Sequence, residues 1–394
     1  MKRFFSRGLL AFCGLLTVQV VWGDWIQSDA SQPFGLLNDT NLAYSLLQEQ
    51  SANQAFLTLG GALQADLQAW GANANLPTIP PNQYPESGSA LALTTADLYT
   101  LANLNNWTQV FFTLQGGLNG YPTTFSEAVI DFGNLSQNPF YASLGEAYLP
   151  FGVFPGGGLV ASTLEASAFE SAQLNQIDLG FAMGPVNTNF VVFNGQNNIN
   201  DFVYNLQYSQ KIGVFSLSGG AGYINDLRYS GSAIAAAYGT SGSRYTIQTG
   251  ILNGGSIGAV SVNAGLNDQL TLNQSLGAAA EWVTTTSSPS VGNIPTGKMQ
   301  AWSITANYNV PIWTKNTTFA IDYSATVHMQ AVPMPMPIPV NAVNVNAVGT
   351  KDQWLGYVQS ELAQNIYLGP EFAWTQLYNG NETWESTLDL SVYI

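Results

Sequence analysis

Apolar and polar residues alternate along most of the chain. In one early segment, leucines, one glycine and one alanine occupy alternate positions from Leu57 to Leu67 and share one face, while Gln64 and Asp66 lie on the other. The last segment, 382–394, repeats the pattern. A period of two predicts β-strands whose two faces meet different surroundings. Soluble sandwiches also alternate, so the pattern alone does not separate them from membrane barrels.

Strand length and loop length favour the membrane. Many segments reach ten or more residues, the length that a tilted spanning strand needs. Trp302 and Trp313 are roughly 28 Å apart along the membrane normal, which matches an apolar band between two aromatic girdles. Links alternate between short and long if 225–255 is one loop. We expect an all-β, transmembrane antiparallel barrel of about 16 strands, near 55–70, 90–104, 107–117, 126–135, 142–150, 172–183, 188–195, 200–209, 212–224, 256–266, 269–285, 298–310, 316–329, 352–363, 366–378 and 382–394.

The N-terminal residues predict export. Basic residues precede an apolar run that ends near small residues, as in a cleaved secretory signal peptide. An uncleaved anchor helix is the alternative, although such helices need about 20 apolar residues. We therefore expect a signal peptide at 1–23, a periplasmic or lumenal segment at 24–54 with a short helix over 38–50, and the barrel at 55–394.

The composition excludes several kinds of active site. The chain has 24 acidic residues, 9 basic residues and one histidine, and only 8% of its residues are charged. Soluble domains carry about 25%. His328 is expected on a lumenal strand face, without partners for a triad or a metal site, and Gly156, Gly157 and Gly158 lack the Lys-Ser or Lys-Thr of a phosphate loop. We expect no enzyme, cofactor, metal or nucleic-acid partner.

Carboxylates opposite the apolar rows are candidates for the lumen wall. A charge on the lipid side costs about 2–4 kcal/mol near mid-bilayer for basic residues and somewhat less for acids, so these groups should point inward. An acidic wall would favour cations. The alternative is that these carboxylates only hydrate the lumen wall and form no binding site. The candidates are Asp66, Asp131, Glu146, Asp322, Glu361 and Asp389.

Basic residues in or beside the expected outer loops are candidates for ligand capture. A carboxylate-rich ligand would be disfavoured by an acidic lumen but attracted by these side chains. The candidates are Arg228, Arg244, Lys298 and Lys351.

Residues 138–154, NPFYASLGEAYLPFGVF, resemble a recurring element of gammaproteobacterial barrel porins. The chain is most similar to the siderophore porin family of the LbtU legiobactin receptor. It departs from the usual barrel ending, because Ile394 replaces a terminal aromatic residue. The resemblance implies an outer-membrane porin that passes a ferric siderophore or a similar small solute, with membrane lipid as its surroundings. A general cation-preferring porin and a structural or adhesive barrel with a blocked lumen remain alternatives, and the sequence leaves the oligomeric state open.

Overall fold

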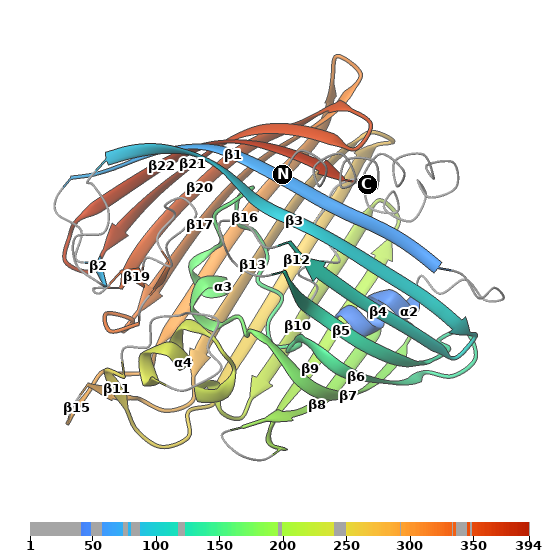
Figure 1. The fold of residues 1–394 in the computed structure, drawn as a ribbon, viewed down its shortest axis with the longest axis horizontal. Helices are drawn as coiled ribbons and strands as arrows, with labels where there is room; N and C mark the ends of the chain where they lie inside the picture. Colours follow the sequence, from blue (N-terminus) through green and yellow to red (C-terminus); the bar gives the residue numbers. More distant parts are fainter. Residues whose placement is uncertain are drawn as a thin grey trace, which may run out of the picture.

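The chain forms a closed barrel of antiparallel strands (Figure 1). Sixteen strands follow one another around the wall, and the ring closes where β1 (Leu57–Ala72) pairs with β22 (Glu382–Tyr393). The expected fold class is therefore confirmed. The structure is a computed structural model that describes residues 41–48, 57–73, 78–79, 87–116, 123–195, 199–239, 250–291, 293–332, 334–335, 345–346 and 349–393.

Each of the expected strand segments corresponds to one strand of the barrel wall. The bounds differ by a few residues, as at the turn expected at 267–268, which lies at 272–273. Asn267 and Asp268 have turn-type side chains, yet they pair with Gly277 and Leu276 and continue the strand. The remaining wall strands are β3 (Ser87–Asn105), β4 (Thr108–Gln115), β5 (Thr124–Gly133), β6 (Phe140–Tyr148), β7 (Gln173–Met183), β8 (Val186–Asn194), β9 (Ile199–Ile212), β10 (Phe215–Ile224), β12 (Ala259–Thr271), β13 (Gln274–Thr285), β16 (Gln300–Ile312), β17 (Lys315–Val327), β20 (Thr350–Ala363) and β21 (Ile366–Leu377).

The outer face of the wall is an apolar band with an aromatic border. Leu67, Ile304 and Ile321 point outward and are each more than half exposed. Near the end of the barrel that carries the long loops, aromatic residues of six adjacent strands form a continuous row, as in the girdles of outer-membrane barrels. The barrel is thus an outer-membrane barrel with its long loops on the extracellular side. The row consists of Trp282, Trp302, Tyr323, Trp354, Trp374 and Trp384.

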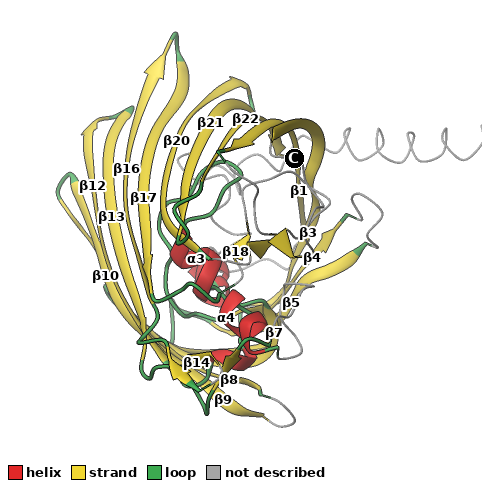
Figure 2. Ribbon diagram, turned by 90° about the vertical axis from the view of Figure 1, so that its left-hand side faces the viewer, coloured by secondary structure: helices red, strands yellow, loops and turns green. Residues whose placement is uncertain are grey.

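Short helices and small sheets lie between the wall strands in sequence. Figure 2 shows α3, α4 and β18 within the ring of strands. None of the helices in the described part of the chain has the length and apolar character needed to cross a bilayer. These elements are α2 (Leu42–Gln48), α3 (Leu164–Phe169), η2 (Leu227–Tyr229), α4 (Ala233–Tyr238), and two sheets formed by β11 (Leu252–Asn253), β14 (Ser290–Val291) and β15 (Ile294–Pro295), and by β2 (Thr78–Ile79), β18 (Met334–Pro335) and β19 (Val345–Asn346).

An apolar core lies inside the extracellular half of the barrel. Inward-facing residues such as Phe193 and Ile224 pack against Phe169 of α3 and Ile234 of α4. Met334 of β18 joins the same core. The segment 225–255 adds no strand to the wall among its described residues, as expected.

The expected N-terminal helix is confirmed, whereas the expected position of His328 is not. The N-terminal helix is present as α2. His328 was expected on the lumenal face of a strand, which is wrong: it follows β17 with a left-handed backbone (φ 60°) and an exposed side chain. The signal peptide and its cleavage lie outside the described residues and stay a prediction, as do the domain boundaries.

Candidate functional site

A long connection between β6 and β7 enters the barrel and lies against its inner wall. We call residues 149–172 the strap. Its outgoing limb reaches β1, where the Gln64 side-chain amide donates to the Leu159 carbonyl at 3.0 Å. Its returning limb contains α3, which contacts β13, β16, β17 and β20. The strap therefore occupies part of the lumen.

A carboxylate of the wall holds the first half of the outgoing limb. Glu281 of β13 accepts hydrogen bonds from the backbone N–H groups of Val153, at 3.0 Å, and of the adjacent Phe154. The Glu281 side chain is almost fully buried. Hydrogen bonds to an ionised acceptor are stronger than neutral ones, and burial keeps water from replacing them.

A second carboxylate holds the tip of the strap in the same manner. Glu371 of β21 accepts from the backbone N–H of Val160 at 2.9 Å and from that of Ala161 at 3.1 Å, one with each carboxylate oxygen. Glu371 is also almost fully buried. The two glutamates thus engage two pairs of adjacent peptide groups, and several strands of the wall separate them.

The glycines of the strap allow this close approach. A Cβ atom on Gly156 would collide with the Asp322 carboxylate, and one on Gly158 would collide with that of Glu371. Gly156 also has a left-handed backbone (φ 94°) that other residues adopt rarely. The glycine run therefore fits a backbone that lies directly on carboxylates of the wall.

The returning limb begins at a capped helix. The Thr163 side chain accepts from the Ala166 N–H, and the Leu164 N–H donates to Ser324 Oγ of β17 at 3.2 Å. Glu165, in the first turn of α3, is fully buried. Desolvation raises the pKa of its carboxyl to about 8, and the charge of Asp322 adds to this, while the nearby hydroxyl groups of Ser303 and Thr163 oppose it.

The N-terminal helix covers a different part of the wall. Leu42 and Leu46 of α2 pack on Leu101 and Phe111, which point inward from β3 and β4. Figure 1 shows α2 beside β4 and β5. Asn41, the residue before α2, is held from β9: the side-chain amide nitrogen of Asn205 donates a hydrogen bond to the side-chain oxygen of Asn41 at 3.3 Å. This helix therefore occupies lumenal space opposite part of the strap-bearing wall.

The structure places most of the candidate lumen residues on the inner face. Asp66 and Asp389 lie directly opposite each other where β1 meets β22, and both are buried. Asp322 is buried against the strap. Asp131 is buried on β5, on the wall near α2, and so lies apart from the other three. Glu361 has the inward parity of the buried Gln359 and lies near the short turn after β20.

Glu146 was expected on the inner face of the barrel, and the structure places it on the outer face. It has the strand parity of Leu144, which is 51% exposed on the outer face, whereas Ser143 and Ala147 point inward and are buried. The inner face of β6 is partly apolar there because α2 covers it. Alternation therefore gave the period correctly but did not show which face is the inner one. Glu146 lies near the strand end, where a charge on the outer face costs about 0–1 kcal/mol.

Several inward carboxylates were missed. Glu281 lies between Ala280 and Trp282, which are on the outer face, so the criterion applied to Asp322 would have found it. The side-chain hydroxyl of Thr387 donates to Glu385 at 2.9 Å. The further inward carboxylates are Asp97, Glu127, Asp178, Asp201, Glu281, Glu371 and Glu385.

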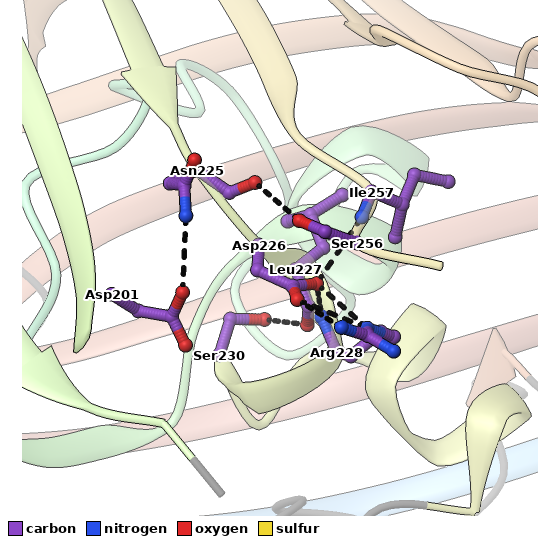
Figure 3. Close-up of polar contacts among 8 residues, drawn as sticks. All are labelled: Asp201, Asn225, Asp226, Leu227, Arg228, Ser230, Ser256 and Ile257. Atoms are coloured by element: carbon purple, nitrogen blue, oxygen red, sulfur yellow. Dashed lines mark hydrogen bonds and ion pairs between the residues drawn. The ribbon is translucent and has the colours of Figure 1, made fainter. Parts of the chain in front are cut away.

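The capture candidate Arg228 is already paired (Figure 3). Its guanidinium contacts both carboxylate oxygens of Asp226, at 2.6 Å for the closest pair, and lies over the Tyr229 ring. Hydrogen bonding to Asp226 raises the pKa of Arg228 from its ordinary value. The Asp226 carboxylate also accepts from the Ile257 N–H, so this pair joins the start of the loop to its end.

The other capture candidates differ in their surroundings. Lys298 is exposed in the loop that precedes β16. Lys351 is exposed at the extracellular end of β20, 3.3 Å from Asp352. Arg244 lies outside the described residues. The structure therefore does not gather these side chains into one cluster among the residues that it describes.

A family match covers well over half of the chain. The family is described as "Protein of unknown function (DUF3573)", and its sequence model matches residues 19–263. The chain belongs to the DUF3573 family. None of the curated proteins matches this DUF3573 chain.

Solved structures similar to this DUF3573 barrel are outer-membrane proteins. A loop-L8 deletion mutant of OmpT, an outer membrane protein of Vibrio cholerae, is 10% identical, with a TM-score of 0.56 over 87% of this chain and 100% of that one. The outer membrane channel DcaP of Acinetobacter baumannii is 10% identical, with a TM-score of 0.56 over 86% and 97%. An anion-selective porin from Comamonas acidovorans is 10% identical, with a TM-score of 0.53 over 86% and 100%. At these identities the similarity shows the porin fold alone.

Proposed function

We propose that this chain is a porin-like channel of the outer membrane, not an enzyme, and that it passes small solutes with a preference for cations. One observation carries the proposal: the inner face of the wall carries many carboxylates along its strands, while the basic residues of the wall strands within the described residues, Lys211, Lys315 and Lys351, all lie at strand ends. Such a wall attracts cations and repels anions.

The position of the acidic residues supports the proposed selectivity. Asp66 and Asp389 face each other across the seam of the barrel. Asp389 also lies beside the side chains of Gln64 and Gln359, so this part of the wall is polar over several strands. An anion-selective porin has the same fold. The sign of the selectivity must therefore come from the wall and not from the fold.

Planar-bilayer recordings under a salt gradient test the proposal. We expect discrete conductance steps and a reversal potential of cationic sign. The double variant Asp66→Asn, Asp389→Asn should lower the cation-to-anion permeability ratio by about twofold, because the acidic pair at the seam leaves the wall. Asp268→Asn is the matched control, since Asp268 pairs with the outward Leu276 near the periplasmic turn. A wild-type barrel without conductance steps contradicts the proposal.

For the solute, we propose an iron chelate or a similar small molecule, as the resemblance to siderophore porins implies. The exposed positions of Lys298 and Lys351 support capture at the extracellular side, whereas Arg228 is neutralised by Asp226. Growth of a deletion strain on iron-limited medium with the purified chelate tests this step. Complementation by the wild type but not by Lys298→Gln, Lys351→Gln is expected, and equal growth with both contradicts the role of these lysines.

A barrel with a blocked lumen is a second candidate. The apolar core beneath the extracellular loops favours it, because it fills space next to β8, β9 and β10. The same bilayer recordings separate the two candidates: conductance supports the channel, and its absence in a folded barrel supports a structural or adhesive role.

A further inference from the structure

The strap is fixed to the wall by two buried glutamates, and this arrangement has a consequence for the path through the barrel. We infer that Glu281 and Glu371 are positioning residues that set the width of the conducting path by holding the strap against the wall. The inference deepens the proposed channel function and rests on it. Neither residue was a candidate in the sequence.

The hydrogen-bond geometry indicates a specific recognition of the strap backbone. Each glutamate accepts from two consecutive peptide N–H groups: those of Val153 and Phe154 for Glu281, and those of Val160 and Ala161 for Glu371. Two aligned donors match the two lone-pair directions of one carboxylate. Because the donors belong to the backbone, the contact depends on the path of the chain more than on side-chain identity.

The charge of these glutamates has no basic counterpart in the described residues. The ion pairs there join Arg228 to Asp226 and Lys351 to Asp352, both at the extracellular loops. The strap N–H groups therefore supply much of the polar stabilisation of the buried Glu281 and Glu371. Release of the strap would leave two carboxylates with fewer partners, which opposes its movement.

The two contacts are placed so that the whole outgoing limb is fixed. Between them, the Pro155 carbonyl accepts weakly from Ser303 Oγ of β16, and Gly156 lies on Asp322 of β17. Beyond them, the Gln64 amide of β1 donates to Leu159. The limb thus follows the wall from β13 to β1, and release at either glutamate would let it move away from the wall into the lumen.

Replacement of either glutamate by glutamine tests the inference. Glutamine has almost the same size, but its amide has one acceptor oxygen, an NH₂ donor and no charge. At position 371 the NH₂ group would face one strap N–H, because each Glu371 oxygen accepts from one of them. At position 281 one oxygen accepts from both N–H groups, so the change removes the carboxylate charge and the second, 3.3 Å contact with the Val153 N–H. Glu281→Gln and Glu371→Gln should lower the mean single-channel conductance by about twofold or more and add rapid fluctuations, because a strap that leaves the wall enters the conducting path.

The matched control is Glu385→Gln. Glu385 is equally buried, lies on β22 next to the strand of Glu371, and accepts from Thr387 of its own strand. It undergoes the same change from carboxyl to amide without a strap contact. We expect it to change the permeability ratio alone. If Glu281→Gln and Glu371→Gln change the ratio to the same extent as the control and leave conductance and noise unaltered, the inference is overturned.

A second measurement does not depend on conduction. The sequence has one cysteine, Cys13, so Cys13→Ser allows a single reporter thiol. Ser167→Cys places it on α3, where the residue is buried within the strap. Labelling by a membrane-impermeant maleimide should become about tenfold faster with Glu281→Gln or Glu371→Gln and stay unchanged with Glu385→Gln. Unchanged labelling in every variant overturns the inference. A wild-type barrel that does not conduct, but whose labelling responds as expected, overturns the proposed function and keeps the strap contacts.

Discussion

The inner wall of this barrel has two regions of opposite character. On β8, β9 and β10 its extracellular half is apolar, with Phe193, Val203 and Ile224 buried beneath α3 and α4. On β21, β22 and β1 the same face carries Glu371, Asp389 and many hydroxyl and amide groups. The difference shows that a barrel interior follows the polarity of what covers it. Where loops fold inward, the wall becomes one side of an ordinary hydrophobic core.

The largest expected effect is on the apolar region. Phe193→Ala removes a ring that is only 1% exposed and leaves a cavity between β8 and the inward loops. Such changes cost about 3–5 kcal/mol. Urea unfolding of the barrel in detergent micelles measures this, with limited proteolysis of the loops as a second readout. A loss below about 1 kcal/mol would mean that the region collapses around the gap and is not close-packed.

A pH-dependent effect of intermediate size is expected where the two regions meet at the strap. Glu165 is fully buried, and its pKa is raised to about 8 from an ordinary value of 4.5. The folded chain therefore binds a proton that the unfolded chain releases, so the stability due to the neutral carboxyl is complete below pH 4.5 and is lost as pH rises toward 8. Glu165→Gln removes this dependence.

The size of this pH-dependent effect is the difference in unfolding free energy between Glu165→Gln and the parent protein. At about 1.4 kcal/mol per pKa unit, the shift from 4.5 to about 8 sets an upper limit of about 5 kcal/mol. Relaxation and water entry around the charge reduce this limit, so the variant should match the parent near pH 4 and exceed its unfolding free energy by about 2–4 kcal/mol at pH 9. Asp322, Ser303 and Thr163 face this carboxyl, and Asp322 interacts with it through its charge. The same comparison is therefore repeated in the Asp322→Asn background, so that the titration of Asp322 does not enter the difference. Parallel stability curves from pH 4 to 9 would show that Glu165 does not titrate within the fold.

The smallest effect is expected on the polar region. Thr375 of β21 is buried, and its hydroxyl makes no hydrogen bond to any residue in the described part of the chain. Thr375→Val keeps the shape and removes the hydroxyl, so the unfolding free energy should change by less than about 1 kcal/mol. Urea titration alongside Phe193→Ala provides the contrast. A loss comparable to that of Phe193→Ala would contradict the division of the wall into these two regions.

The fold was predictable because the outer face of every wall strand meets one uniform solvent. Lipid requires apolar side chains at alternate positions, so segments such as 315–327 show the period clearly. The inner face has no such uniformity. Glu146 was assigned to the wrong side because its strand faces α2 inside the barrel. Alternation gives the period of a strand but not its inner side where both faces are apolar.

The candidate site was less predictable because it depends on contacts between distant segments. The acidic wall followed from strand parity, as for Asp66 and Asp389. The strap did not, since nothing in the glycine run 156–158 indicates that its partner is a carboxylate of another strand. Arg228 appeared to be a free cation in a loop, although Asp226, two residues earlier, binds it.

The seam between β1 and β22 constrains how the barrel can be assembled. Ala62 of β1 pairs with Tyr393 of β22. The N–H and C=O groups on this edge of the first wall strand therefore have no strand partner until the last strand is in place. Until then, both strands present open edges that could pair with another chain. Biogenesis must therefore shield two edges during the whole of synthesis and export, and a product truncated before β22 would remain an open sheet prone to aggregation and proteolysis.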